Sequence, residues 1–475
     1  MKDTQPRLKR LEEYSPPAFL VDTVDLRFEL GDQETRVRST LALRRNPALA
    51  AAGAALELNG QGLGLLGMSI DGRELAPAEY AYDGDLLRIE QVPDAFRLQS
   101  EVRIEPQNNT ALEGLYRSRG MFCTQCEAEG FRRITFFPDR PDVLARFSTE
   151  IIASRETCPV LLSNGNAVER EELPGGRHRV RWEDPFPKPS YLFALVAGDL
   201  ASLDDTFVTR SGREVSLRIF VEPKDLDKCA FGMEALKQSM RWDEEVYGRE
   251  YDLDVFMIVA VDDFNMGAME NKGLNVFNTS CLLASPDITT DAGYLRIAGI
   301  VAHEYFHNWS GNRVTCRDWF QLSLKEGFTV FRDAQFSADT GARVVRRIEN
   351  VALLRTAQFA EDSGPMAHPV QPSSYLEINN FYTLTVYEKG AELVRMLREL
   401  LGGESFRRAC DLYFDRHDGQ AKPGRRGMAA SRDSAREWRN PCQQFIATNA
   451  ARIPSHMSPN RRAMASSAST PANPT

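Results

Sequence analysis

One short stretch constrains this chain more than any other. Residues 296–328 contain two of the six histidines, His303 and His307, and Glu304 directly follows the first of them. Positions i and i+4 lie on one face of a helix, so both imidazoles can point at a single ion. The next residue along a helix is rotated by roughly 100°, which places the Glu304 carboxylate beside the ion rather than among its ligands. The stretch therefore indicates a helix that carries a metal site.

A second helical pattern, over residues 318–333, supplies a further carboxylate. Glu326 lies nineteen residues after His307, and antiparallel packing of the two helices would bring it to the same ion. Two imidazoles and a carboxylate suit zinc, with Glu304 placed to take a proton from a metal-bound water. The alternative is a histidine pair without metal, which is common at this spacing. The downstream glutamate favours the metal.

Length and composition indicate a globular chain with more than one domain. At 475 residues, 42% hydrophobic and 26% charged, the chain is too long for one ordinary core. Its net charge of −9 argues against a nucleic-acid partner. The longest apolar runs, such as residues 255–261, are too short to cross a bilayer, and the charged residues 1–14 show no signal peptide. We expect a cytoplasmic protein without membrane insertion.

Eight cysteines are scattered along the chain, and Cys123 and Cys126 form the one close pair. A zinc or redox role for this pair would need a second pair or a strand-to-helix setting. Neither is visible in the sequence. We therefore favour free, buried thiols in a reducing compartment.

The patterning divides the chain into two folded parts. Residues 1–200 alternate apolar and polar residues with frequent turn residues, which predicts an antiparallel β-sandwich-like domain. Residues 201–420 contain further strands, a helix, an apolar strand and then a mainly helical stretch after Asp291. The expected fold class is α+β, with a catalytic domain that follows a β domain.

The last 55 residues, 421–475, differ from both parts. They contain nine lysines and arginines against two acids, and no sustained apolar period, so we expect a disordered tail. The abrupt change suggests a reading-frame shift near Ala421 that leaves the catalytic domain incomplete at its C-terminal end. A native basic tail is the alternative.

A second motif, GAMEN at residues 267–271, follows the apolar strand. Small residues let another backbone approach closely, so this segment suits pairing with an extended peptide. Glu270 then offers a fixed negative charge at the end of that edge. A free α-amine is the natural partner, which would restrict cleavage to the first peptide bond.

Together these two motifs resemble the aminopeptidase N family, of the bacterial alanyl aminopeptidase type, from the N-terminus to about Ala421. The resemblance implies a thermolysin-like catalytic domain and one zinc ion per chain, held by His303, His307 and Glu326. It also implies Glu304 as the general base in removal of the N-terminal residue from peptides. Substrates would be peptides with a free N-terminus, cleaved with broad specificity that includes Ala, Arg and Lys.

The resemblance also assigns substrate-binding residues. Glu127 and Glu270 would hold the free amine, and Tyr387 would stabilise the oxyanion. The same pocket would be lined by Gln125, Met266, Gly267, Ala268, Met269 and Asn271. From the residues alone, Glu127 is interpreted as a solvated side chain and Tyr387 as a packed aromatic, and both alternatives stay open.

Two further residues lie next to the expected ligands in the sequence. Asn308 and Lys325 are interpreted as supporting or solvent-facing groups rather than catalysts.

An epoxide-hydrolysing relative with the same metal site is one alternative function. A metal-binding protein without turnover, intact or impaired, is the other. We expect a monomer.

Overall fold

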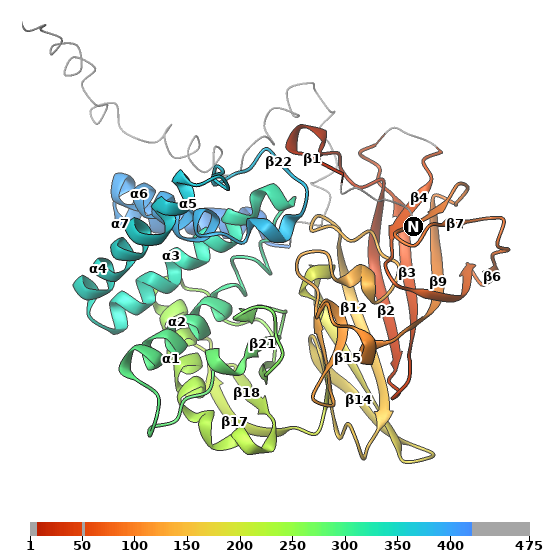
Figure 1. The fold of residues 1–475 in the computed structure, drawn as a ribbon, viewed down its shortest axis with the longest axis horizontal. Helices are drawn as coiled ribbons and strands as arrows, with labels where there is room; N and C mark the ends of the chain where they lie inside the picture. Colours follow the sequence, from red (N-terminus) through yellow and green to blue (C-terminus); the bar gives the residue numbers. More distant parts are fainter. Residues whose placement is uncertain (1–6, 50–52, 420–475) are drawn as a thin grey trace, which may run out of the picture.

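The computed structural model describes residues 7–49 and 53–419, and the expectation for residues 421–475 lies outside them. Two halves lie side by side (Figure 1). One half is built of β-strands, and the other combines a sheet with helices. The predicted α+β class, with a β domain followed by a mainly helical domain, is confirmed.

The β half contains sheets of eight, four and three strands. The eight-stranded sheet has the order β14-β15-β12-β2-β3-β9-β5-β6, and its neighbours are antiparallel except for the parallel pair β2 and β12. The other sheets have the orders β10-β11-β16-β13 and β4-β8-β7. The bounds are β2 (Phe19–Glu29), β3 (Thr35–Arg45), β4 (Leu56–Asn59), β5 (Gly64–Ile70), β6 (Arg73–Glu74), β7 (Ala81–Tyr82), β8 (Leu86–Ile89), β9 (Ala95–Ile104), β10 (Gly114–Ser118), β11 (Met121–Gln125), β12 (Leu144–Ser154), β13 (Val160–Ser163), β14 (Asn166–Leu173), β15 (Arg177–Pro189) and β16 (Leu195–Gly198).

The second half begins with a five-stranded sheet of order β17-β18-β19-β21-β20. Its strands are β17 (Ala201–Val208), β18 (Glu214–Val221), β19 (Val255–Val261), β20 (Ala268–Met269) and β21 (Leu274–Asn278). The short strand β20 lies at the edge and pairs antiparallel with β21. Ala268 and Met269 of the GAMEN motif therefore form an edge strand of the sheet.

Strand β19 shows how this sheet joins the two halves. Side chains alternate across a strand, and Met257, Val259 and Val261 belong to the core shared with the β half. The alternate residues Phe256, Ile258 and Ala260 belong to a second core beneath the helices. Because both faces of the strand are buried, its sequence is apolar throughout rather than alternating.

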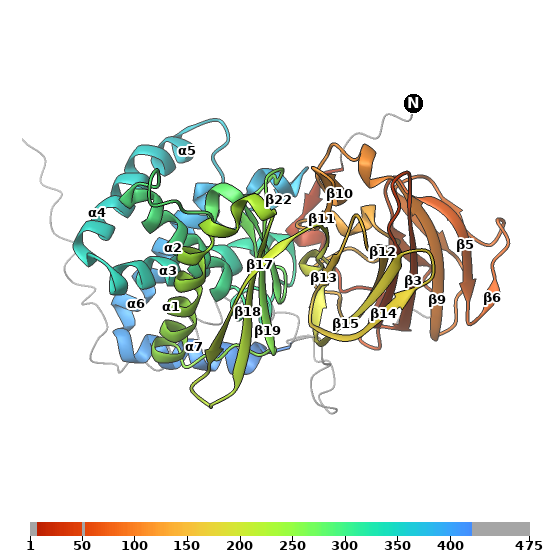
Figure 2. The ribbon, with the colours of Figure 1, turned by 90° about the horizontal axis from the view of Figure 1, so that it is seen from below.

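Helices cover the face of the sheet that points away from the β half (Figure 2). They are α1 (Ala230–Val246), α2 (Asp291–Phe306), α3 (Leu322–Thr340), α4 (Arg343–Leu353), α5 (Phe359–Ser363), α6 (Gly390–Leu401) and α7 (Gly403–His417). Helix α2 packs between α1 and α3, and α3 also packs against α6. A π-helical turn, η10 (Thr385–Lys389), leads directly into α6.

A short strand pair joins the start of the chain to the helical half. Strand β1 (Lys9–Arg10) pairs antiparallel with β22 (Ser374–Tyr375), in the segment that precedes η10 (Figure 1). Among the described residues, no helix combines the length and apolar composition that a membrane span requires. The seven cysteines within the described ranges are all free and buried, as expected.

Candidate active site

Helix α2 presents both histidines at its C-terminal end. The Thr290 hydroxyl caps the start of the helix by accepting a 3.1 Å hydrogen bond from the Gly293 amide. The chain then folds back after His307 through Gly311, whose φ is +144°. A Cβ at Gly311 would lie 2.8 Å from His307 Nδ1, so this tight return requires glycine.

Three donor atoms converge between α2 and α3. His303 Nε2 and His307 Nε2 are 3.0 Å apart, and Glu326 Oε2 lies 3.4 Å from each of them. Ligands of a tetrahedral zinc ion, bonded at about 2.0–2.1 Å, are separated by about 3.3 Å. The triangle therefore has the size of one face of a zinc coordination tetrahedron.

The Nδ1 atoms of both histidine rings point away from the triangle and lie within hydrogen-bond distance of other groups. His303 Nδ1 is 2.7 Å from Asp333 Oδ2, and His307 Nδ1 is 2.7 Å from the Ser310 carbonyl oxygen. Both partners are acceptors, so each Nδ1 donates a proton, and in the neutral form of each ring Nε2 presents a lone pair to the centre of the triangle. Glu326 Oε2 is buried without a hydrogen-bond partner in the described chain. Three converging acceptors repel one another, and a cation between them resolves the repulsion. The residues fit a divalent metal ion.

Glu304 lies beside this triangle rather than in it. The side chain is buried, and its carboxylate lies within 4.8 Å of ligand atoms of Glu270 and His307. Burial is the main reason why the pKa of Glu304 is raised well above its usual range. The positive charge of His303 lowers this pKa, and the negative charges of Glu270 and Glu326 raise it further. The structure thus places a buried carboxylate near His307 and Glu270.

Two further carboxylates close the other side of the site. Glu127 follows β11 and is buried at 7% exposure, so the interpretation as a solvated side chain is wrong. Its Oε1 accepts a 2.8 Å hydrogen bond from the Tyr382 hydroxyl. Glu270 directly follows the edge strand β20, and its carbonyl accepts a 2.9 Å bond from Asn312 Nδ2. The β half, the edge strand and the loop after α2 therefore meet here.

Lys325 is the central cation of the site. Its Nζ lies 2.8 Å from Glu127 Oε1 and 2.5 Å from both Glu270 Oε1 and Glu326 Oε1. Burial opposes the charge, but these three carboxylates raise the pKa of Lys325 well above its usual range. Asn308 is also buried and accepts a 2.7 Å bond from Lys272 Nζ. Neither Lys325 nor Asn308 faces solvent, so that alternative is wrong for both.

The remaining predicted pocket residues lie around the two carboxylates. Gln125 is buried and donates to the Glu127 carbonyl at 3.2 Å and to Met269 Sδ at 3.8 Å. Asn271 Nδ2 donates to the Phe193 carbonyl at 3.2 Å. Gly267 is exposed, whereas Met266 and Ala268 are half-buried. Accessible surface within residues 266–271 is therefore confined to residues 266–268.

Tyr387 reaches the site from η10. Its ring is nearly parallel to the His303 ring, at 14° and a centroid separation of 6.4 Å. Helices α3 and α6 approach closely here, as a Cβ added at Gly327 would lie only 3.0 Å from the Gly390 Cα. The absence of side chains at these glycines permits the contact. Gly327 follows Glu326, and Gly390 lies one turn after Tyr387. This close contact brings the tyrosine to the donor triangle, and π-helical turns are common at functional sites.

Three residues next to the site were not predicted from the sequence: Asp333, Tyr382 and Thr329. Asp333 lies seven residues after Glu326, which is two helical turns and hence the same face of α3. That spacing was a usable signal, since metal-bound histidines often donate to a carboxylate. No comparable signal marks Tyr382, or Thr329, whose hydroxyl lies 3.3 Å from His307 Nδ1.

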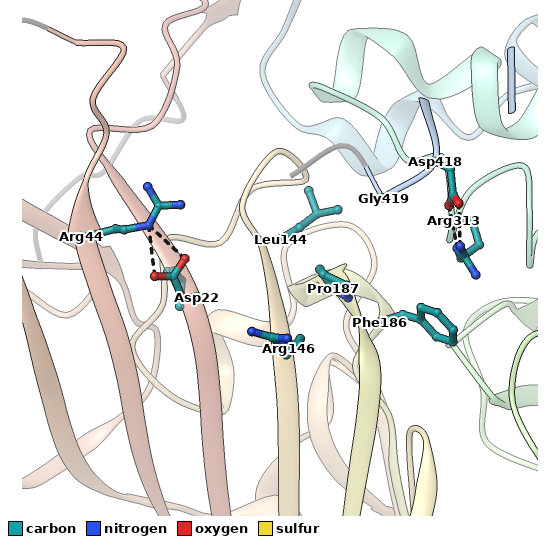
Figure 3. Close-up of a pocket in the computed structure, with 10 residues that line it drawn as sticks. Asp22, Arg44, Leu144, Arg146, Phe186, Pro187, Arg313, Asp418 and Gly419 are labelled. Atoms are coloured by element: carbon teal, nitrogen blue, oxygen red, sulfur yellow. Dashed lines mark hydrogen bonds and ion pairs between the residues drawn. The ribbon is translucent and has the colours of Figure 1, made fainter. Parts of the chain in front are cut away.

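A separate hollow lies where the described chain ends. It is lined by residues of β2, β3, β12 and β15 together with Arg313, Asp418 and Gly419 (Figure 3). Arg313 pairs with Asp418 there at 2.6 Å and with the half-buried Asp252 at 2.7 Å. None of the residues that line this hollow belongs to the predicted site.

Two models of one protein family match this chain. Residues 231–426 match the model of the peptidase family M1 domain, and residues 68–192 match that of the peptidase M1 N-terminal domain. The chain belongs to peptidase family M1. The predicted resemblance to the aminopeptidase N family is thereby confirmed, and so is the order of its two domain types.

Individual relatives of this M1 chain include the bacterial aminopeptidase N proteins. That of Caulobacter vibrioides is 59% identical over 89% of this chain and 48% of its own length. That of Escherichia coli is 56% identical over 88% of this chain and 47% of its own length. The solved structure of Legionella pneumophila aminopeptidase A, in complex with aspartic acid, matches with a TM-score of 0.80 and 39% identity over 87% of this chain and 47% of that one. The chain spans about half the length of these relatives.

Proposed function

We propose that this chain carries the active site of a zinc-dependent aminopeptidase, which hydrolyses the N-terminal residue from peptides. The observation that carries the proposal is the position of Glu326 Oε2, buried without a hydrogen bond and 3.4 Å from the Nε2 atoms of both histidines. Membership of family M1 and similarity to aminopeptidase N proteins support it.

We further propose that His303, His307 and Glu326 hold one zinc ion per chain. Two imidazoles and a carboxylate form a common ligand set for catalytic zinc, with a fourth position left open. Zinc, when bound, supplies a Lewis acid for the scissile carbonyl and lowers the pKa of a bound water.

The proton transfers are assigned to Glu304. A buried carboxylate beside the ligands can accept a proton from the attacking water and deliver it to the leaving amine. Tyr387 is assigned a different task, because its hydroxyl can donate a hydrogen bond to the oxyanion of the tetrahedral species. Its place beside the His303 ring supports this role.

Restriction to the N-terminal residue is assigned to the carboxylates of Glu127 and Glu270. A substrate that pairs with the edge of β20 would run its first residue toward Glu270. A charged α-amine then gains charge-assisted hydrogen bonds that a blocked amine cannot make. Gln125, Met269 and Asn271 adjoin these carboxylates and complete the proposed pocket.

We also propose a broad first-residue specificity, a cytoplasmic location and a domain boundary near residue 200. The half-buried Met266 offers a flexible thioether that suits several first residues, including Ala, Arg and Lys. Seven free, buried thiols support a cytoplasmic location. A boundary near residue 200 is supported by the change from the β half at Gly198 to the five-stranded sheet at Ala201.

An assay of fluorogenic aminoacyl amides with and without a metal chelator tests the proposal. We expect hydrolysis that the chelator abolishes and added zinc restores. A folded, zinc-loaded protein that cleaves no aminoacyl amide would instead support the alternative of an inert metal-binding chain.

A further inference from the structure

The position of the Lys325 ammonium points beyond the proposed mechanism. Its side chain is 1% exposed, and Nζ contacts one oxygen from each of Glu127, Glu270 and Glu326 at 2.8, 2.5 and 2.5 Å. A lysine ammonium has three N–H donors, and these three oxygens can satisfy all of them. The ammonium therefore fills the centre of a buried carboxylate triangle.

This triangle also has the composition of a metal site. One oxygen from each of the same three glutamates lies within 4.8 Å of the other two. Carboxylate oxygens are the ligands that hard divalent cations such as Mn²⁺ prefer. Without the lysine, three buried carboxylates would stand together with no opposite charge among them, which is strongly unfavourable.

Glu326 connects this triangle to the zinc ligands. Its Oε1 lies 2.5 Å from Lys325 Nζ, whereas its Oε2 lies 3.4 Å from both histidine Nε2 atoms. A carboxylate whose two oxygens face neighbouring cation positions is typical of two-metal hydrolytic sites, where the ions lie about 3.5–4 Å apart. Here one of the two positions holds a tethered ammonium.

We propose that Lys325 occupies a second cation position and thereby limits this site to a single divalent ion. The inference rests on the proposed function, in which His303, His307 and Glu326 hold zinc.

Metal stoichiometry tests this inference without any measurement of turnover. The native chain and Lys325→Met are first loaded with Zn²⁺, then dialysed against Mn²⁺, and both elements are measured per chain by mass spectrometry. We expect one zinc and no manganese in the native chain, and one zinc with one manganese in Lys325→Met. Lys325→Gln, which keeps hydrogen-bond donors without the charge, gives the same prediction if Lys325→Met does not fold.

Two controls isolate the position of the charge. Lys272→Met removes another buried ammonium, which pairs with Asp252 rather than with the triangle, and should bind no manganese. Adding Glu127→Gln to Lys325→Met should abolish or weaken manganese binding at least tenfold. A native chain that binds no zinc would contradict the proposed function. A native chain that binds both ions, or a folded, zinc-loaded Lys325→Met that binds no manganese, would overturn this inference.

Discussion

His303 Nδ1 lies 2.7 Å from the Oδ2 atom of Asp333. The two residues come from facing helices, α2 and α3, so the contact fixes both the ring orientation and its tautomer. A carboxylate in this position also increases the basicity of the opposite ring nitrogen. We therefore expect Asp333 to control how well His303 binds a metal ion.

Replacing Asp333 by asparagine should weaken zinc binding by about 10–100-fold, the usual loss for a partner of a metal-bound histidine. Competition with a fluorescent chelator measures the affinity. Asp339→Asn is the matched control, because Asp339 lies on the same helix and is bonded to Trp242 instead. Equal zinc affinity in Asp333→Asn and the native chain would show that the contact is only structural.

His307→Ala and Glu304→Gln should separate metal binding from proton transfer. The first removes a donor of the triangle and should lose most of the zinc. The second leaves all three donors in place and should keep the zinc while losing turnover, because an amide cannot accept the proton. Metal analysis and an aminoacyl-amide assay on the same samples give both results. An active Glu304→Gln would refute its assignment as general base.

Tyr387→Phe should lower kcat by about 10²–10³-fold, the usual loss for one oxyanion donor, with little change in KM. Tyr382→Phe is the informative comparison, since it removes the hydroxyl that donates to Glu127. We expect it to raise KM instead, through the amine pocket. Steady-state kinetics distinguish the two, and an effect of Tyr387→Phe on KM alone would make Tyr387 a binding residue.

The carboxylate of Glu270 should enforce the requirement for a free N-terminus. We expect a free peptide to be cleaved and its N-acetylated form to resist cleavage, because only the charged amine pairs with buried carboxylates. Mass spectrometry of the two digests measures the ratio. Comparable cleavage of both peptides would contradict an exopeptidase.

The parts of the site that the sequence predicts share a local cause. Helical spacing brings His303 and His307 to one face, and small residues mark the edge that carries Glu270. Glu127 and Tyr387 required the family resemblance, because they arrive from the β half and from η10, and no local pattern reports such contacts. No local pattern reports the contacts of Lys325 either, because its partners lie at positions 127, 270 and 326. A buried lysine and a solvated one look alike in a sequence.

The two-faced sheet illustrates the same limit. The run at residues 255–261 predicts a strand, but periodicity alone does not show that alternate residues enter two different cores. Likewise, nothing in the residues Lys9 and Arg10 indicates that they pair with Ser374 and Tyr375. Long-range pairing depends on the complete fold, so it becomes visible only in the structure.

Zinc titration of the metal-free chain tests the central claim most directly. Bound zinc and release of the first residue from a peptide with a free N-terminus are followed in the same samples. We predict that hydrolysis rises in proportion to bound zinc and stops rising at one ion per chain, with neither observed in His307→Ala. Hydrolysis that is independent of zinc, or a folded chain that binds one zinc ion and releases no residue, would contradict the account.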